Sequence, residues 1–384
     1  MSDVVSYDVE ADPEADEFAG NGPQEGERVA VIRTSDRNAF RSCRRKWFFS
    51  SHLKSNLSPV TAANPLWYGS GFHYAMEDFH GDQRWPTARQ AFIEYVKASR
   101  KAAKDDKRLL PPDFLELADL GTRMLDFYTN DWLAQRDPLK TFIYQGRPQV
   151  EVHVLLELPF KCPEYDRVFY GATLDRIVID KNGGLWIVDY KTAKRFITNH
   201  FDNDPQITSY TWIGNQLYPG YKIEGFIYQQ HRKDSPKEPD LLSNGRLSTR
   251  KGQLTTHQMY RRALINQYGE VLKAPIENID YLNELANQGD LNQDHFIRRD
   301  FIYRNQHQIE SEGAKLMMEL EDILNPNLPL YPSPDRNCGH MCSFYHPCIS
   351  MDDGSDWEYE IQIGYRSRNI DFDRWRKFLP PIES

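Results

Sequence analysis

The sequence contains no run of 18 apolar residues, so no segment is expected to span a membrane. Its N-terminus lacks the basic and then apolar segments of a secretory signal peptide, which indicates a cytoplasmic protein. No GxxxxGK[ST] motif occurs, and this excludes a P-loop nucleotide-driven motor within the chain. No internal repeat and no clear linker after residue 28 are visible, and 384 residues suffice for a large core in one or two domains.

The acidic excess of the chain, a formal net charge of −9, is unevenly distributed. Residues 1–28 hold nine of the 56 acids and only one of the 47 bases, so the rest of the chain carries −1. This acidic segment with its glycines and prolines is expected to be a disordered leader. The nearly neutral remainder has basic clusters at residues 41–46 and 246–252, and therefore permits a DNA partner without requiring one.

Apolar periodicity and turn residues predict both helices and strands. Helices are expected over residues 34–53, 68–80, 87–107, 113–135 and 203–217, and strands over 148–160, 168–180, 185–192, 222–232 and 295–303. This order predicts an α/β fold with a central mixed sheet flanked by helices, together with an additional helical region. We divide the chain into an acidic leader (1–28), an N-terminal helical region (29–136), a core sheet (137–232), a helical region with a cysteine-rich tail (233–350) and a C-terminal extension (351–384).

The stretch "GGLWIVDYKTAKRF", residues 183–196, places Asp189 and Lys191 on one side of a strand and Tyr190 on the other. A two-residue turn at Asn182 and Gly183 would pair Asp175 of the preceding strand with Tyr190. A three-residue loop over 181–183, with Gly183 left-handed, would instead place Asp175 opposite Asp189. We predict the second register, or a bulge with the same effect, because only it puts both carboxylates on one face.

Two further pairs of polar residues are spaced four apart on predicted helices, so each pair shares a helix face. They are His73 with Glu77, and Gln206 with Tyr210. Each pair could be an ordinary set of surface or core residues, and Glu77 alone is most simply a solvated charge. Glu151 alternates with apolar residues in "QVEVHV", which makes outward exposure the simpler expectation for its side chain.

Taken in order, a helical His in "GSGFHYAMEDF", then "GATLDRI", "DYK" and "QITSY" resemble the PD-(D/E)xK nuclease superfamily, specifically its RecB/AddB-like branch. The resemblance covers residues 34–350. It implies that His73, Asp175 and Asp189, with the Tyr190 carbonyl, bind one or two Mg²⁺ or Mn²⁺ ions. Asp175, Asp189 and Lys191 would be catalytic, with Lys191 positioning or activating the attacking water.

The same resemblance implies that Gln206 and Tyr210 orient the scissile strand or the lysine, and it leaves Glu77 and Glu151 as candidates for supporting the ligands. A phosphodiester is anionic, so its hydrolysis needs cations to offset developing charge. The resemblance implies a deoxyribonuclease, an exonuclease on single-stranded or end-frayed DNA with 5′-to-3′ polarity, from a bacterium or phage. Recombination, repair or phage DNA metabolism, with a recombination or helicase partner protein, would be its setting.

Other classes of protein remain open at this point. The chain could be an inactive DNA-binding or assembly subunit, a zinc-stabilised interaction protein, or a sequence-specific endonuclease. Bases and aromatic residues interleave at 44–48, and Tyr74 follows His73. Channels for single-stranded DNA use this combination, but a packed helix with a solvated basic face has it equally often.

Four of the five cysteines are predicted to form one metal site. Three lie in "CGHMCSFYHPC" and one in "SCRRKWFF", and clustered cysteines in a cytosolic protein indicate a metal or redox site. Zinc bound by Cys₄, or by Cys₃His with His340 or His346, fits this composition. The arrangement resembles the iron–sulfur clamp of AddB-type and CRISPR-associated RecB-like exonucleases, which implies a 4Fe–4S cluster on Cys43, Cys338, Cys342 and Cys348. The first two cysteines of the run are separated by three residues where the family usually has two, and Cys162 is expected to be an ordinary thiol.

Overall fold

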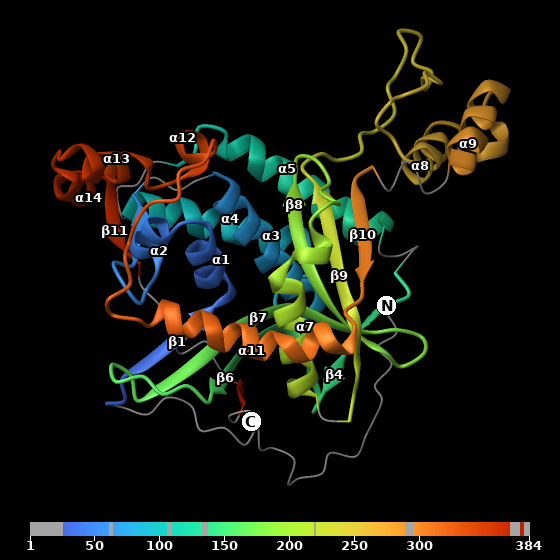
Figure 1. Ribbon diagram of the computed structural model, residues 1–384. Coiled ribbons are helices and arrows are strands. Elements are labelled where there is room, and N and C mark those ends of the chain that lie inside the picture. The colour runs from blue at the N-terminus through green and yellow to red at the C-terminus, as the bar shows by residue number, and fades with distance from the viewer. Residues whose placement is uncertain are drawn as a thin grey trace.

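The computed structural model describes residues 26–60, 64–105, 110–132, 137–218, 220–288, 295–368 and 377–379 (Figure 1). Only residues 26–28 of the predicted acidic leader belong to this described part, so its predicted disorder lies outside it. In the described part of the chain, we find no helix with the length and apolar character needed to cross a membrane.

An eight-stranded mixed sheet forms the centre of the molecule. Its strands are β1 (Val29–Arg33), β3 (Lys140–Thr141), β6 (Val150–Leu158), β7 (Arg167–Ile179), β8 (Leu185–Ala193), β9 (Ile223–Arg232), β10 (Ile297–Ile302) and β12 (Lys377–Leu379). The main path runs β10-β9-β8-β7-β6-β12, with β1 and β3 both pairing β7. The β8–β9 pair is parallel and β7 is antiparallel to both β6 and β8. The predicted α/β fold with a central mixed sheet is confirmed.

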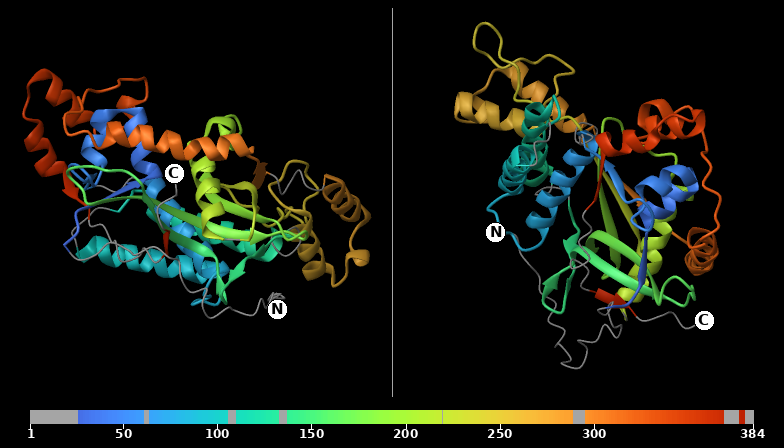
Figure 2. Two further views of the ribbon diagram at one scale, coloured as in Figure 1. Left: turned by 60° about the horizontal axis from the view of Figure 1, so that its bottom comes forward. Right: turned by 90° about the vertical axis from the view of Figure 1, so that its left-hand side faces the viewer.

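Helices cover both faces of this sheet (Figures 1 and 2). They are α1 (Thr34–Ser42), α2 (Arg44–Ser50), α3 (Asn64–His80), α4 (Ala88–Asp105), α5 (Phe114–Phe127), α7 (Pro205–Leu217) and α11 (Gln306–Ile323). Alternation along β8 divides the core, because Leu185 and Ile187 pack with α7 and α11 while Trp186 and Val188 pack with α3, α4 and α5. Strands buried on both faces read as nearly continuous apolar runs, as β8 does.

The remaining elements lie around this core. They are β2 (Leu57–Pro59), a π-helical turn η1 (Tyr128–Trp132), β4 (Ile143–Tyr144), β5 (Arg147–Pro148), η2 (Phe201–Asn203), α8 (His257–Tyr268), η3 (Val271–Lys273), α9 (Ile276–Gln288), α12 (Cys338–Met341), α13 (Tyr345–Asp353), α14 (Trp357–Gly364) and β11 (Tyr365–Ser367). Helices α8 and α9 lie in the connection between β9 and β10 and have a small core of their own (Figure 1). Helices α12–α14 lie beside α1 and α2, from the other end of the chain (Figures 1 and 2).

The hairpin between β7 and β8 has the predicted register. Ile179 pairs with Leu185 and Arg176 with Val188, so the same register continued by one residue places Asp175 opposite Asp189. The loop is closed by the Asp180 N–H, which donates to the Gly184 carbonyl, and Gly183 has a φ of 86°. Glycine tolerates this left-handed conformation because it has no Cβ. The three-residue loop is therefore confirmed.

Two sequence-based expectations about the N-terminal part are corrected by the structure. The single helix expected over 34–53 is two helices, because Cys43 adopts an extended conformation (φ −166°, ψ 118°) between α1 and α2. Residues 29–33 were not predicted as a strand, yet β1 pairs in parallel with β7. The sheet therefore includes strands from outside residues 137–232.

Candidate active site

The predicted metal-binding residues come from three neighbouring elements. His73 lies in the middle of α3, Asp175 near the end of β7, and Asp189 to Lys191 near the end of β8. Both strand ladders weaken at this point: the β7–β8 pairing reaches Arg176 and Val188, and the β6–β7 pairing passes from Val150 directly to Val152. Asp175 therefore lies where β7 is paired with neither β6 nor β8, and α3 contacts both β7 and β8 in this part of the structure.

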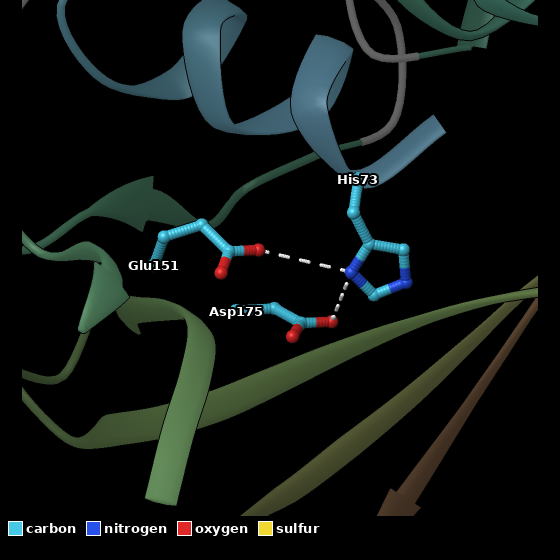
Figure 3. Close-up of side chains that lie close together, drawn as sticks. All are labelled: His73, Glu151 and Asp175. Atoms are coloured by element: carbon cyan, nitrogen blue, oxygen red, sulfur yellow. Dashed lines mark ion pairs between the residues drawn. The ribbon is translucent and has the colours of Figure 1, made fainter. Parts of the chain in front are cut away.

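His73, Glu151 and Asp175 converge into one compact group (Figure 3). His73 Nδ1 lies 3.3 Å from Asp175 Oδ2 and 3.7 Å from Glu151 Oε1. One ligand atom from each residue lies within 4.8 Å of the others, and among the described residues no other group of His, Cys, Asp or Glu meets this criterion. The structure thus brings His73 and Asp175 together, as predicted.

Glu151 belongs to this group, contrary to the outward exposure expected from alternation. Its backbone has a φ of 45°, in the left-handed region that a β-strand residue rarely adopts. This local departure from strand geometry changes the direction of the side chain, which is 18% exposed and approaches His73. A non-glycine residue in this conformation costs about 1–2 kcal/mol, and such strain is concentrated at functional sites.

Asp189 and Lys191 form a close ion pair next to this group. Lys191 Nζ lies 2.5 Å from Asp189 Oδ2, and Asp189 itself is 2% exposed. Lys191 is the charged partner of this buried oxygen. Tyr190 links the two strands, because its backbone N–H donates to Asp175 Oδ2 over 2.8 Å. Asp189 thus places a buried carboxylate beside Lys191 and next to Asp175.

Helix α7 carries Gln206 to the other carboxylate oxygen of Asp189. Asp204 caps the helix by accepting the Gln206 backbone N–H, and Pro205 occupies the first turn, as is common at helix starts. The Gln206 amide then donates to Asp189 Oδ1 over 3.0 Å. Gln206 therefore contacts an acid of the site. Tyr210 is buried one turn later, and burial together with Tyr170 and the acids of the site raises its pKa well above the ordinary value.

Two other residues differ from the sequence-based expectation: Glu77 was a candidate but lies outside the compact group, whereas Tyr228 was not a candidate but lies beside Asp189. Glu77 lies one turn after His73 but is outside the compact group, with a 39% exposed side chain that lies 3.8 Å from Arg84. Tyr228 on β9 pairs with Asp189 in the parallel ladder, and its phenol, whose pKa burial raises to about 12, interacts with Lys191. Sequence reasoning missed Tyr228, because the register of two parallel strands joined by a helix has no local sequence signal.

The carboxyl pKa values of Glu151 and Asp189 reflect burial first and neighbouring charges second. Burial, with the neighbouring Asp175, raises the pKa of Glu151 to about 7. Burial raises the pKa of Asp189 to about 6, although Lys191 opposes the shift. Burial alone would lower the pKa of His73, but Asp175 and Glu151 raise it well above its ordinary value. The metal-free site is therefore a set of coupled acids whose charge is partly offset by an imidazolium and an ammonium.

The donors of this site suit a divalent cation with a preference for oxygen. Carboxylate oxygens from Glu151, Asp175 and Asp189 are the ligands that Mg²⁺ and Mn²⁺ favour, and one imidazole favours Mn²⁺. Burial disfavours the charged forms of Glu151 and Asp189 and raises their pKa values, and a bound cation would offset this cost. The residues present therefore fit the metal that the sequence resemblance implies.

The four predicted cysteines surround one cavity of about 340 Å³, which is also lined by Lys46, Phe49, Pro332 and Phe344. Backbone N–H groups donate to two of the sulfurs: those of Lys46 and Ser333 to Cys43, and that of Asp335 to Cys338. Arg45 donates to Cys348 over 3.5 Å. Cys162, in contrast, lies elsewhere and donates to Glu164. The cavity lies between the α1–α2 junction and the α12–α13 segment.

Comparison with protein families agrees with this geometry. The family model of the PD-(D/E)XK nuclease superfamily matches residues 34–348. The match covers most of the chain, which therefore belongs to this superfamily of nucleases. A comparison with curated proteins finds no match.

The structure predicts that Glu151→Gln weakens Mn²⁺ binding by about 10- to 100-fold, because the neutral amide removes one of the converging charges. Isothermal titration of the metal-free protein with Mn²⁺ measures this change. Glu157→Gln is the matched control, since Glu157 lies on the same strand but pairs with Arg167 over 2.5 Å. Equal Mn²⁺ affinity of Glu151→Gln and the wild type would show that Glu151 is not a ligand.

Mn²⁺ affinity should also rise with pH between about 6 and 8. The raised pKa values of Glu151, at about 7, and of His73 mean that both hold protons at the lower pH, and a metal must displace them. Binding titrations in two buffers of different ionisation enthalpy should detect net proton release. An affinity that does not change over this range, with no proton release, would contradict the assignment of these two residues.

Proposed function

We propose that this protein is a metal-dependent deoxyribonuclease that hydrolyses phosphodiester bonds of DNA. The observation that carries the proposal is the convergence of His73, Glu151 and Asp175 beside the Asp189–Lys191 pair, where the sheet opens. Membership of a nuclease superfamily supports the same reaction class. A site of this kind suits an anionic substrate only when a cation offsets the carboxylates.

A bound Mg²⁺ or Mn²⁺ would supply Lewis-acid stabilisation of the charge that develops on the phosphate. The residues of the chain have separate tasks. His73, Glu151, Asp175 and Asp189 hold the cation, with the Tyr190 carbonyl as a further candidate. Gln206 keeps the Asp189 carboxylate oriented through its 3.0 Å hydrogen bond.

Lys191 positions the attacking water or the scissile phosphate through its positive charge. Burial would lower the pKa of its ammonium, but Asp189 and Asp175 raise it above the ordinary value. In the metal-free protein the lysine therefore remains a hydrogen-bond donor, so it suits the role of orienting a nucleophile better than the role of removing a proton. Its side chain is 34% exposed, which leaves it accessible to substrate.

For the substrate, we propose single-stranded or end-frayed DNA, degraded exonucleolytically with 5′-to-3′ polarity. This detail rests on the resemblance to RecB/AddB-like nucleases and not on a distance in the site. Among the aromatic residues at 44–48, Trp47 is fully buried and therefore cannot stack on a base. A recombination or helicase partner protein and a bacterial cytoplasmic setting belong to the same proposal.

The proposal predicts that Lys191→Ala lowers the rate of DNA cleavage by at least about 100-fold, because a charge aimed at the reacting phosphate is lost. Lys194→Ala is the control, since this exposed lysine three residues later should leave kcat near the wild-type value. Single-stranded DNA labelled at the 5′ or the 3′ end, incubated with Mn²⁺, reports both rate and polarity. Folded wild-type protein that cleaves no DNA form with either metal would favour the inactive-subunit alternative.

We further propose that Cys43, Cys338, Cys342 and Cys348 hold a 4Fe–4S cluster. Amide donors to cysteine sulfur, as at Cys43 and Cys338, are common around such clusters. The four cysteines line one cavity of about 340 Å³, and a Cys₄ zinc site is the alternative there. Free thiols also fit a reducing compartment.

Protein purified without oxygen should contain iron and acid-labile sulfide in equal amounts, near four of each per chain if a 4Fe–4S cluster is present. Cys348→Ser should lose this iron and lower the melting temperature, because the α12–α13 segment is then released from α2. Cys162→Ser should retain the iron. Stoichiometric zinc without sulfide would overturn the cluster assignment and favour the zinc alternative.

A further inference from the structure

Within the described residues Asp175 on β7 has no ladder partner, and Asp189 on β8 pairs with Tyr228 of β9 but not with β7. Backbone pairing between β7 and β8 extends to Arg176 and Val188 and leaves Asp175 and Asp189 one residue beyond it. On the other side of β7, the ladder to β6 omits Asp175 and Glu151. A metal site needs its ligands in fixed relative positions, so another interaction has to hold the strands where the ladders stop.

Tyr190 connects the same two strands from both faces of the sheet. On the side of the acids, its backbone N–H donates to Asp175 Oδ2 over 2.8 Å. On the opposite face, its hydroxyl accepts a hydrogen bond from Arg176 Nη1 over 3.3 Å. Each of these two side chains follows one acid in the sequence, so their contact lies directly behind the pair Asp175 and Asp189.

Buried partners hold Arg176 and Tyr190 rigidly. Arg176 is 3% exposed, and its Nε donates to Thr141 Oγ1 over 2.9 Å while Asp137 lies 3.8 Å away. Asp137 is also paired with Arg299 over 2.8 Å. The Tyr190 ring is 1% exposed and stacks on His80, with 6.2 Å between centroids and 4° between planes.

We infer that Tyr190 and Arg176 are positioning residues that fix the spacing of Asp175 and Asp189 from the back of the sheet. This inference rests on the proposed function, because it assigns the two residues to the metal site. The hydroxyl–guanidinium contact replaces the missing rungs of the ladder and keeps the Tyr190 N–H aimed at Asp175. Both His73 and the Tyr190 N–H contact Asp175 through Oδ2, and neither of these two contacts involves Oδ1.

Tyr190→Phe tests the inference, because it removes the hydroxyl and keeps the stacked ring. Mn²⁺ affinity should fall by about tenfold, and kcat should fall by a similar factor with little change in KM for DNA. In metal-free protein, hydrogen exchange of the backbone amides at residues 185–193 should become faster, since the strands separate more easily. Tyr128→Phe is the control: that hydroxyl bonds His80 over 2.9 Å in the same buried cluster, and Tyr128 belongs to η1 and not to either strand.

The result that supports the inference is a loss of Mn²⁺ affinity and of amide protection in Tyr190→Phe that Tyr128→Phe does not share at a similar melting temperature. Unchanged affinity and exchange in Tyr190→Phe would overturn it, and so would equal losses in both variants, which would indicate general destabilisation. The exchange measurement needs neither metal nor DNA. A wild-type protein without nuclease activity would therefore refute the proposed function, while the exchange data would still decide whether Tyr190 holds the strands.

Discussion

The structure depends on the crowding of three carboxylates, Glu151, Asp175 and Asp189, at one opening of the central sheet. Burial, with a smaller contribution from the neighbouring Asp175, raises the pKa values of Glu151 and Asp189 to about 7 and about 6. His73 and Lys191 offset part of the charge from the front. A divalent cation bound here would offset the rest.

The surrounding fold connects this site to distant parts of the chain. Gln206 reaches Asp189 from the first turn of α7, and the same helix carries Ser209, which accepts a hydrogen bond from Arg37 of α1. Arg37 is 1% exposed and also pairs with Glu312 and Glu319 of α11 over 2.8 and 2.6 Å. Cys43 ends α1, so a continuous set of contacts runs from the cysteine cavity through α1 and α7 to the acids. Removing one partner of a buried ion pair lowers the free energy of unfolding by about 3–5 kcal/mol. The Arg37 pairs therefore stabilise this connection.

Much of the fold and of the site could be predicted from the sequence, because local chemistry determined it. The "KNGG" turn allowed two registers of the β7–β8 hairpin, and the requirement that both carboxylates share one face selected the three-residue loop, in which Gly183 tolerates the positive φ. Glu151 was placed outward because alternation cannot detect one left-handed residue inside a strand. The position of Tyr228 depends on the register of two parallel strands joined by a helix, and the break at Cys43 depends on packing between chain ends. No single sequence window carries a signal for either. The roles of the site residues and of the four cysteines stay predictions.

The most direct test of the metal site is anomalous diffraction at the manganese edge from crystals soaked in Mn²⁺. The account predicts a peak within coordination distance of His73, Glu151, Asp175 and Asp189, at about 2.0–2.3 Å from each ligand atom it binds. Crystals of Glu151→Gln, with one charge fewer, should show a weaker peak at the same place. No peak among these residues in well-ordered wild-type crystals, or a peak elsewhere in the chain, would contradict the claim that the crowded acids form a metal site.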